Sequence, residues 1–115
     1  MKTMGILDDR SYWKNKDTDR LFEAVLSLKT LPEAERFFRD LMTIPEIETF
    51  AERLKVATLL QEGVPYREIA KMSKASTATI TRVNQWLTKG MDGYKLVLSR
   101  ITSKIHHHRT VKAAL

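Results

Sequence analysis

Residues 66–83, YREIAKMSKASTATITRV, decide the fold of this chain. Ile69 and the small Ala70 give the first part of this stretch an apolar contact surface. Ile80 and Val83 share one side of the second part because they are three residues apart. Neither part alternates apolar and polar residues as a strand does. The spacing predicts two short helices that pack on each other across a tight turn.

The connection between these two helices is predicted at Ser73–Ala75. Ser76 follows it and can accept a hydrogen bond from a free N–H in the first turn of the second helix. Turns of this kind often carry glycine in the left-handed region, and Lys74 occupies that place here. We expect Lys74 to adopt a positive φ at a cost of about 1 kcal/mol. The helix-turn-helix then covers about residues 65–87.

Spacings of three and four between apolar residues predict helices in the rest of the chain as well. Thr30 and Thr43 are suited to cap two of them, each with a proline in the first turn, and Gly63 and Gly90 are expected to end two others. Asp92 can cap the last helix. The predicted helices cover 17–28, a stretch after Thr30, 43–62, 64–72, 76–89 and a stretch after Asp92. We therefore expect an all-α fold.

The third predicted helix is apolar on too many sides for a surface helix. One stripe holds Ile47, Phe50, Leu54 and Ala57, and further apolar residues lie away from it at Val56, Leu59 and Leu60. Such a helix is either central to its own domain or buried between two subunits. A chain of this size also gains stability from a shared core, so we expect a homodimer.

The chain has 115 residues and no internal linker, which predicts one helical domain at 17–102. It is flanked by an N-terminal arm, 1–16, and a basic C-terminal tail, 103–115. There is no cysteine, no basic-then-apolar leader and no run of about 18 apolar residues. We expect a cytoplasmic protein with no membrane partner.

The formal net charge of +6 is unevenly distributed. Residues 1–60 carry 10 Lys/Arg and 11 Asp/Glu, net −1, whereas residues 61–115 carry 10 and 3, net +7. A basic half of this kind attracts a polyanion, with an affinity that falls as salt rises. The alternative is a basic surface that serves only solubility.

The outward face of the second motif helix carries small, hydrogen-bonding side chains, which suit contact with phosphates and base edges in the major groove of double-stranded DNA. They are Thr77, Ala78, Thr81, Gln85 and Thr88. The ammonium of Lys74 would lie near the DNA backbone. The alternative is a plain helical hairpin within an all-helical core.

Four strings resemble the bacterial tryptophan repressor superfamily, and most closely its YerC/YecD-like branch. They are FAERLKV at 50–56, LLQEG at 59–63, RE at 67–68 and ATITR at 78–82. The resemblance extends over about Asp17–Ser99. It implies a six-helix Trp-repressor-like fold, in which the N-terminal helices of two chains interlock into an intertwined homodimer and each subunit presents one DNA-reading head.

The resemblance also implies roles for single residues. Arg67 matches a position that reaches a guanine edge, and the start of the second motif helix matches positions that face DNA. With the residues named above, the expected DNA-binding set is Arg67, Lys74, Ser76, Thr77, Ala78, Thr79, Thr81 and Gln85. Arg67 is the first choice for base contact because arginine reads guanine through two parallel hydrogen bonds.

In the family, a tryptophan corepressor lies between two arginines. These match Arg53 and Arg82, and Thr43 matches a third pocket residue. Val83 stands where the pocket needs glycine, and Trp86 replaces a small serine, so we expect the pocket to be filled from within and tryptophan not to act as a cofactor. A different small effector is the alternative. Arg53 and Arg82 are then expected to stack on the Trp86 ring or to pair with a carboxylate such as Glu52.

Other chemistry finds no support in the sequence. His106–His108 are three adjacent histidines in a tail, which is not the arrangement of a tetrahedral metal site. There is no phosphate loop, nucleophile motif or paired carboxylate, so we expect no enzyme. The sequence predicts a sequence-specific regulator, a repressor bound as a homodimer to a near-palindromic operator. The alternatives are an architectural DNA-binding protein and a helical protein-interaction module.

Overall fold

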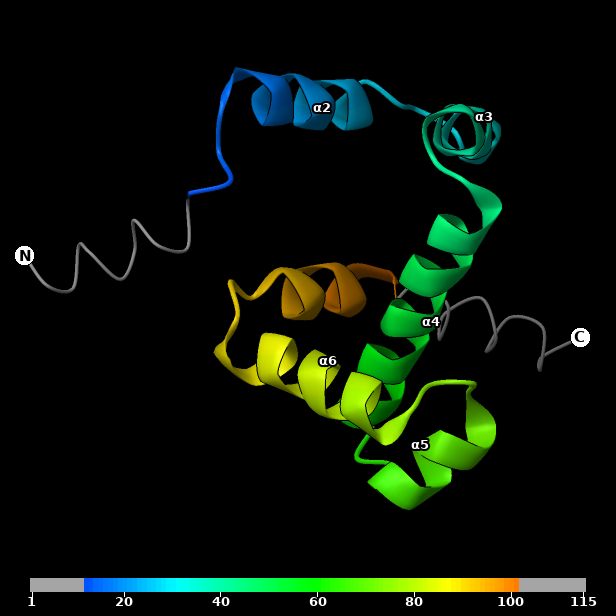
Figure 1. The fold of residues 1–115 in the computed structure, drawn as a ribbon. Coiled ribbons are helices and arrows are strands. Elements are labelled where there is room, and N and C mark those ends of the chain that lie inside the picture. The colour runs from blue at the N-terminus through cyan, green and yellow to red at the C-terminus, as the bar shows by residue number, and fades with distance from the viewer. Residues whose placement is uncertain (1–11, 102–115) are drawn as a thin grey trace, which may run out of the picture. The chain divides into compact units, whose positions relative to one another are not determined.

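The computed structural model describes residues 12–101, and within that range the chain is all-α, with six helical segments and no strand (Figure 1). The segments are α2 (Lys16–Leu26), α3 (Leu31–Leu41), α4 (Ile44–Gln61), α5 (Tyr66–Met72), α6 (Thr77–Lys89) and residues 93–101. The predicted tail at 103–115, with His106–His108, and most of the predicted arm lie outside the described residues. The six-helix expectation is confirmed.

The chain divides into two compact units, Met1–Thr43 and Ile44–Leu115, and each is described by itself. In the first unit, Asn15 caps α2: its side chain accepts the Thr18 N–H at 2.9 Å, and Thr18 Oγ1 accepts the Asn15 N–H at 2.8 Å. This reciprocal cap explains why α2 begins at Lys16 rather than Asp17. The predicted Thr30 cap of α3 is confirmed, since Thr30 Oγ1 accepts the Glu33 N–H at 3.2 Å.

Neither helix of the first unit has a buried residue in the single chain. Phe22 is 50% exposed, Leu26 84% and Leu31 71%. Each helix nevertheless has a well-defined apolar side, which normally faces a core. Within the first unit, the apolar faces of α2 and α3 are thus left uncovered.

In the second unit, α4, α5 and α6 pack on one another, and the last helical segment adds Leu98. The core consists of fully or almost fully buried side chains from all four segments: Val56, Ala57, Leu59, Ile69, Ile80, Val83 and Leu98. The predicted packing of Ile69 on Ile80 and Val83 is therefore confirmed. Ala70 is exposed, so the contact predicted for it is wrong.

The two ends of α4 have different surroundings. Val56, Ala57 and Leu59 of its second half are buried in the core of the unit, whereas Ile44 and Phe50 of its first half are 52% and 51% exposed. The helix is central to its own unit and also presents apolar surface beyond it. Its predicted stop is confirmed, because Gly63 follows with a φ of 83°.

Gly90 ends α6, as predicted, by donating its N–H to the Trp86 carbonyl at 3.0 Å. A Cβ at this position would collide with the same carbonyl oxygen. The φ of Gly90 is −85°, which any residue can adopt. Glycine is therefore required for the close approach of its backbone to that of Trp86, and not for a left-handed conformation. This geometry fixes where α6 stops and the chain turns toward residues 93–101.

Candidate nucleic-acid interface

The helix-turn-helix consists of α5, a connection at residues 73–76, and α6. Burial of Ile69, Ile80 and Val83 fixes the two helices against each other and against α4. Because Ile80 and Val83 occupy the inner side of α6, the opposite side of this helix faces solvent. The second helix of the motif is therefore held rigidly with one polar side free.

The connection differs from the prediction at Lys74. Among residues 12–101, the one non-glycine residue with a positive φ is Asp92, so the expectation of a left-handed Lys74 is wrong. The backbone is extended at Ser73 instead, with φ −131° and ψ 172°. The Lys74 N–H donates to Glu52 Oε1 of α4 at 2.5 Å, and the Ala75 N–H donates to Ser73 Oγ at 3.2 Å. Side-chain acceptors thus hold a turn that was expected to need a left-handed residue.

Ser76 caps α6, as predicted, by accepting the Thr79 N–H at 3.1 Å. Its hydroxyl donates to Thr79 Oγ1, also at 3.1 Å. Both side chains therefore have a structural task at the start of the helix. Ser76 is exposed and Thr79 is partly buried, so of the two, Ser76 is the more accessible to a ligand.

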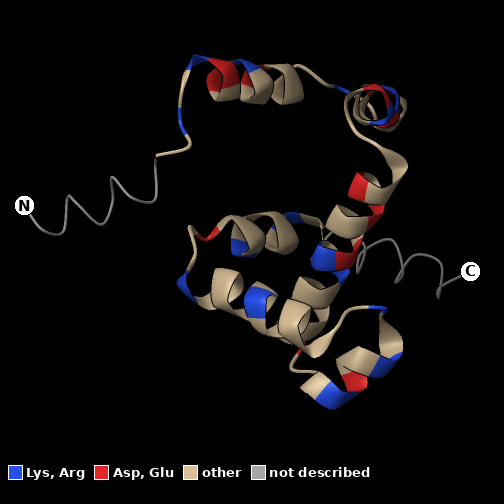
Figure 2. Ribbon diagram, viewed as in Figure 1, with Lys and Arg blue, Asp and Glu red and all other residues tan. Residues whose placement is uncertain are grey.

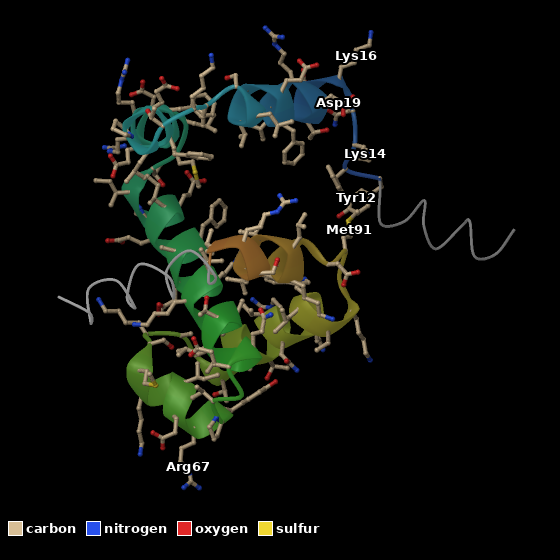
Figure 3. The ribbon with its side chains drawn as sticks, turned by 180° about the vertical axis from the view of Figure 1, so that it is seen from behind. Tyr12, Lys14, Lys16, Asp19, Arg67 and Met91 are labelled. Carbon is tan, nitrogen blue, oxygen red and sulfur yellow. The ribbon has the colours of Figure 1, made fainter. Side chains whose placement is uncertain are left out.

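The remaining residues predicted to bind DNA are exposed. They are Arg67 on α5, Lys74 in the connection, and Thr77, Ala78, Thr81 and Gln85 on α6. The side chain of Arg67 extends away from the helices into solvent (Figure 3). The short side chains on α6 let its backbone approach a nucleic-acid groove closely. Apart from the partly buried Thr79, the predicted residues are thus exposed on α5, on the connection and on α6.

Basic side chains are present on α5 and α6 (Figure 2). Lys71 was missed at the sequence level, although its spacing of four from Arg67 places both on one side of α5. Lys71 Nζ lies 3.7 Å from Glu68 Oε2, and both side chains are well exposed. Exposed pairs of this kind contribute about 0–1 kcal/mol, so Lys71 can exchange Glu68 for a phosphate at little cost.

An open groove of about 1090 Å³ lies between α4 and the motif. Of the predicted pocket residues, Arg53, Arg82 and Trp86 line it, whereas Thr43 and Val83 do not. Val83 is fully buried in the core, so the expectation that it fills the pocket is wrong. The spacing of three from Ile80 placed Val83 in the core, as observed, whereas the family correspondence placed it in the pocket, whose lining does not include it.

Trp86 is 40% exposed, and Arg53 lies against its ring. The guanidinium carbon is 5.2 Å from the Trp86 ring centroid and 5.4 Å from that of Phe50. The predicted stacking is confirmed for Arg53. Arg82 has no ring contact or ion pair within residues 12–101, and Glu52 bonds the connection rather than either arginine.

Tyr94 lies close enough to Arg53 for the two to interact electrostatically. Burial raises the pKa of the Tyr94 hydroxyl above its usual range, and the positive charge of Arg53 opposes that shift. Arg53, Phe50 and Trp86 thus form a cluster that links α6 to α4, and the charge of Arg53 also reaches Tyr94.

Residues 12–101 hold neither a metal-binding group of side chains nor a candidate membrane-spanning helix. No group of three His, Cys, Asp or Glu side chains is placed to hold a metal ion there. None of the helices in the same range is long and apolar enough to cross a membrane.

Comparison with known proteins gives consistent matches. The sequence model of the family described as "Trp repressor protein" matches residues 16–102. The uncharacterized protein YerC of Bacillus subtilis is 49% identical over 88 residues, which are 76% of this chain and 85% of YerC. A TrpR-like protein from Eubacterium eligens matches with a TM-score of 0.76 and 46% identity, over 80% of this chain and 95% of that one. A candidate Trp repressor from Staphylococcus aureus matches with a TM-score of 0.76 and 39% identity, over 80% and 92%.

The contact between Arg53 and Trp86 should be measurable as an energetic coupling. In a double-mutant cycle of Arg53→Met and Trp86→Leu, we expect a coupling of about 0.5–1 kcal/mol in the free energy of unfolding, because a cation over an indole ring is favourable at a partly exposed site. Urea denaturation gives the four values. The control cycle pairs Arg53→Met with Gln85→Ala and should show no coupling. A coupling energy between Arg53 and Trp86 no larger than that of the control cycle would contradict the contact.

Proposed function

Because the chain belongs to the Trp repressor protein family, a family of DNA-binding regulators, we propose that it binds double-stranded DNA sequence-specifically as a homodimer. It occupies a near-palindromic operator in the cytoplasm, represses transcription and has no catalytic activity. Membership of this family supports the DNA-binding class.

The observation that carries the proposal is the exposed polar face of α6. Its inner side is locked by Ile80 and Val83, while Thr77, Thr81 and Gln85 face solvent next to a capped helix start. A helix presented in this way can enter the major groove without rearrangement. Arg67 and Lys74, both exposed, supply a guanine-reading side chain and a phosphate contact beside it.

Selection of bound sequences from random duplex DNA, with purified protein and no added ligand, tests the proposal directly. A recovered palindromic motif supports a sequence-specific homodimer. Salt-dependent binding with no recovered motif would favour an architectural DNA-binding protein. No salt-dependent binding at all would favour a protein-interaction module and overturn the proposal.

The homodimer rests on apolar surface that one chain leaves uncovered. Leu26 and Leu31 of the first unit and Phe50 of α4 are each more than half exposed in the single chain. Fully burying one such side chain contributes about 1.5–3 kcal/mol. A second copy that covers these faces would recover this free energy, in agreement with the interlocked dimers that the family resemblance implies.

Independence from tryptophan rests on Trp86. Its indole ring already lies against Arg53, one of the two arginines that the resemblance assigns to the corepressor. A fixed side chain has no translational freedom to lose, so α6 can be held ready for DNA without a ligand. The groove beside it is open to solvent, whereas small-molecule sites bury most of the ligand surface. We therefore propose that DNA binding requires no cofactor.

Arg67→Ala should reduce sequence specificity, whereas Lys74→Ala should reduce general affinity for DNA. Loss of Arg67 should cost about 1–3 kcal/mol on the selected site and relax base choice at one position, because a paired hydrogen bond to guanine is removed. Loss of Lys74 should weaken all duplexes alike and reduce the salt slope by about 1. Lys95→Ala removes the same charge outside the motif and serves as the control. Equal losses on selected and random DNA for Arg67→Ala would make Arg67 a phosphate contact.

The protein should sediment as a dimer at micromolar concentration, at about twice 13.3 kDa. Leu26→Asp should dissociate the dimer or lower its free energy of unfolding by considerably more than about 0.5 kcal/mol. The same change at an exposed leucine of a monomer would alter the free energy of unfolding by less than about 0.5 kcal/mol. Arg20→Asp, on an exposed position of the same helix, is the control. A folded monomer of the unaltered protein would refute the dimer.

Free L-tryptophan should neither bind measurably nor change DNA affinity, and calorimetry checks both. Trp86→Ser should vacate the ring position over Arg53, create weak tryptophan binding and lower ligand-free DNA affinity. Val83 is left intact because its removal would open the core rather than the groove. Micromolar tryptophan binding by the unaltered protein would contradict this account.

A further inference from the structure

We propose that Glu52 of α4 is a positioning residue that sets the orientation of the DNA-reading helix α6, an inference that rests on the proposed function. Its carboxylate accepts the backbone N–H of Lys74, 22 residues away in the chain.

The connection is tied at three points by side chains. Ser73 Oγ donates to the Ile69 carbonyl at 2.8 Å and accepts the Ala75 N–H, which anchors the start of the connection to α5. Ser76 caps α6 and anchors its end. Glu52 holds the middle, and it is the one acceptor of the three that comes from outside the motif.

The middle hydrogen bond, from Lys74 to Glu52, holds a connection that contains no left-handed residue. A left-handed residue at Lys74 would close the turn locally, but the backbone is extended at Ser73 and again at Ser76, where φ is −74° and ψ 163°. In this connection no backbone carbonyl of residues 12–101 accepts the Lys74 N–H, and a hydrogen bond to a carboxylate is about twice as strong as one to a neutral acceptor. Glu52 supplies that carboxylate from α4.

Glu52 is suited to this task because its own position is fixed. It lies one helical turn before Val56, which is fully buried in the core, and its side chain is half-buried. The hydrogen bond from the Lys74 N–H to Glu52 therefore fixes the backbone just before α6 relative to α4. Two proposed DNA contacts, Lys74 and Ser76, lie at or next to the tied amide.

A comparison with Glu48 separates a positioning role of Glu52 from a simple effect of its negative charge. Glu48 also lines the groove and is exposed, and its side chain makes no hydrogen bond within residues 12–101. Removing an acidic side chain near a DNA-binding surface should strengthen binding to a polyanion, and Glu48→Ala should do this for every duplex. A positioning role for Glu52 predicts the opposite sign on the selected site.

The experiment compares Glu52→Ala, Glu52→Gln and Glu48→Ala in the full chain. Amide hydrogen exchange at Lys74 is read by NMR, and affinity is measured on a duplex selected by the unaltered protein and on a random duplex. For Glu52→Ala we expect Lys74 exchange to accelerate about tenfold and affinity for the selected duplex to fall about tenfold, as for the loss of one charge-assisted hydrogen bond. Random-duplex affinity should not fall.

Glu52→Gln keeps an oxygen acceptor and should restore the ratio of selected to random affinity to within about threefold of the unaltered protein, since a neutral acceptor makes a weaker version of the same bond. Should Glu52→Ala fail to fold, Glu52→Asp, whose carboxylate is one methylene shorter, replaces it. Glu52→Ala behaving like Glu48→Ala, or Glu52→Gln failing as completely as Glu52→Ala, would overturn the proposal. Absence of DNA binding by the unaltered protein would refute the proposed function alone, because Lys74 exchange still decides whether Glu52 holds the connection.

Discussion

The burial of Ile69, Ile80 and Val83 against Val56 and Ala57 is the constraint on which the second unit depends. Each side chain excluded from water contributes about 1.5–3 kcal/mol for the larger residues, so the three helices cannot separate without a large loss. This packing dictates which side of α6 is outermost. The proposed DNA binding depends on the side chains that remain exposed on α6, which are the hydroxyls of Thr77 and Thr81 and the amide of Gln85. The buried inner face keeps this helix from rotating. A rigid helix with a polar face suits groove recognition because little order has to be imposed on binding.

Features set by neighbouring residues could be predicted from the sequence. Thr30 and Ser76 cap the helices that they precede, Gly63 stops α4, and the period of three and four placed Ile69, Ile80 and Val83 inside. Features set by contacts between distant segments could not. The path at Lys74 depends on Glu52, and nothing in the local sequence indicates that a carboxylate 22 residues away accepts its N–H. Val83 was placed in a ligand pocket by family correspondence, whereas its direction is decided by packing against α4.

The cluster around Arg53 reverses the arrangement that the family resemblance implies. There, a ligand ring lies between two arginines; here, the guanidinium of one arginine contacts the rings of Phe50 and Trp86. Arg82 lines the groove but has no ring partner within the described residues. We propose that this side-chain contact takes the place of a bound ligand, so that regulation through this site needs a different input. Together with the Glu52 tie, the cluster gives α4 two attachments to the reading head, one to α6 and one to the connection before it.

The central claim is that α6 and the connection before it are the surface that meets DNA. Backbone amide shifts of the unaltered protein, recorded by NMR with and without a duplex recovered by selection, test this most directly. The account predicts that the largest changes fall at Arg67 and at residues 74–85, with Ile69 and Val56 of the core little altered. Changes confined to α3 or to residues 93–101, with α6 unaffected, would contradict it.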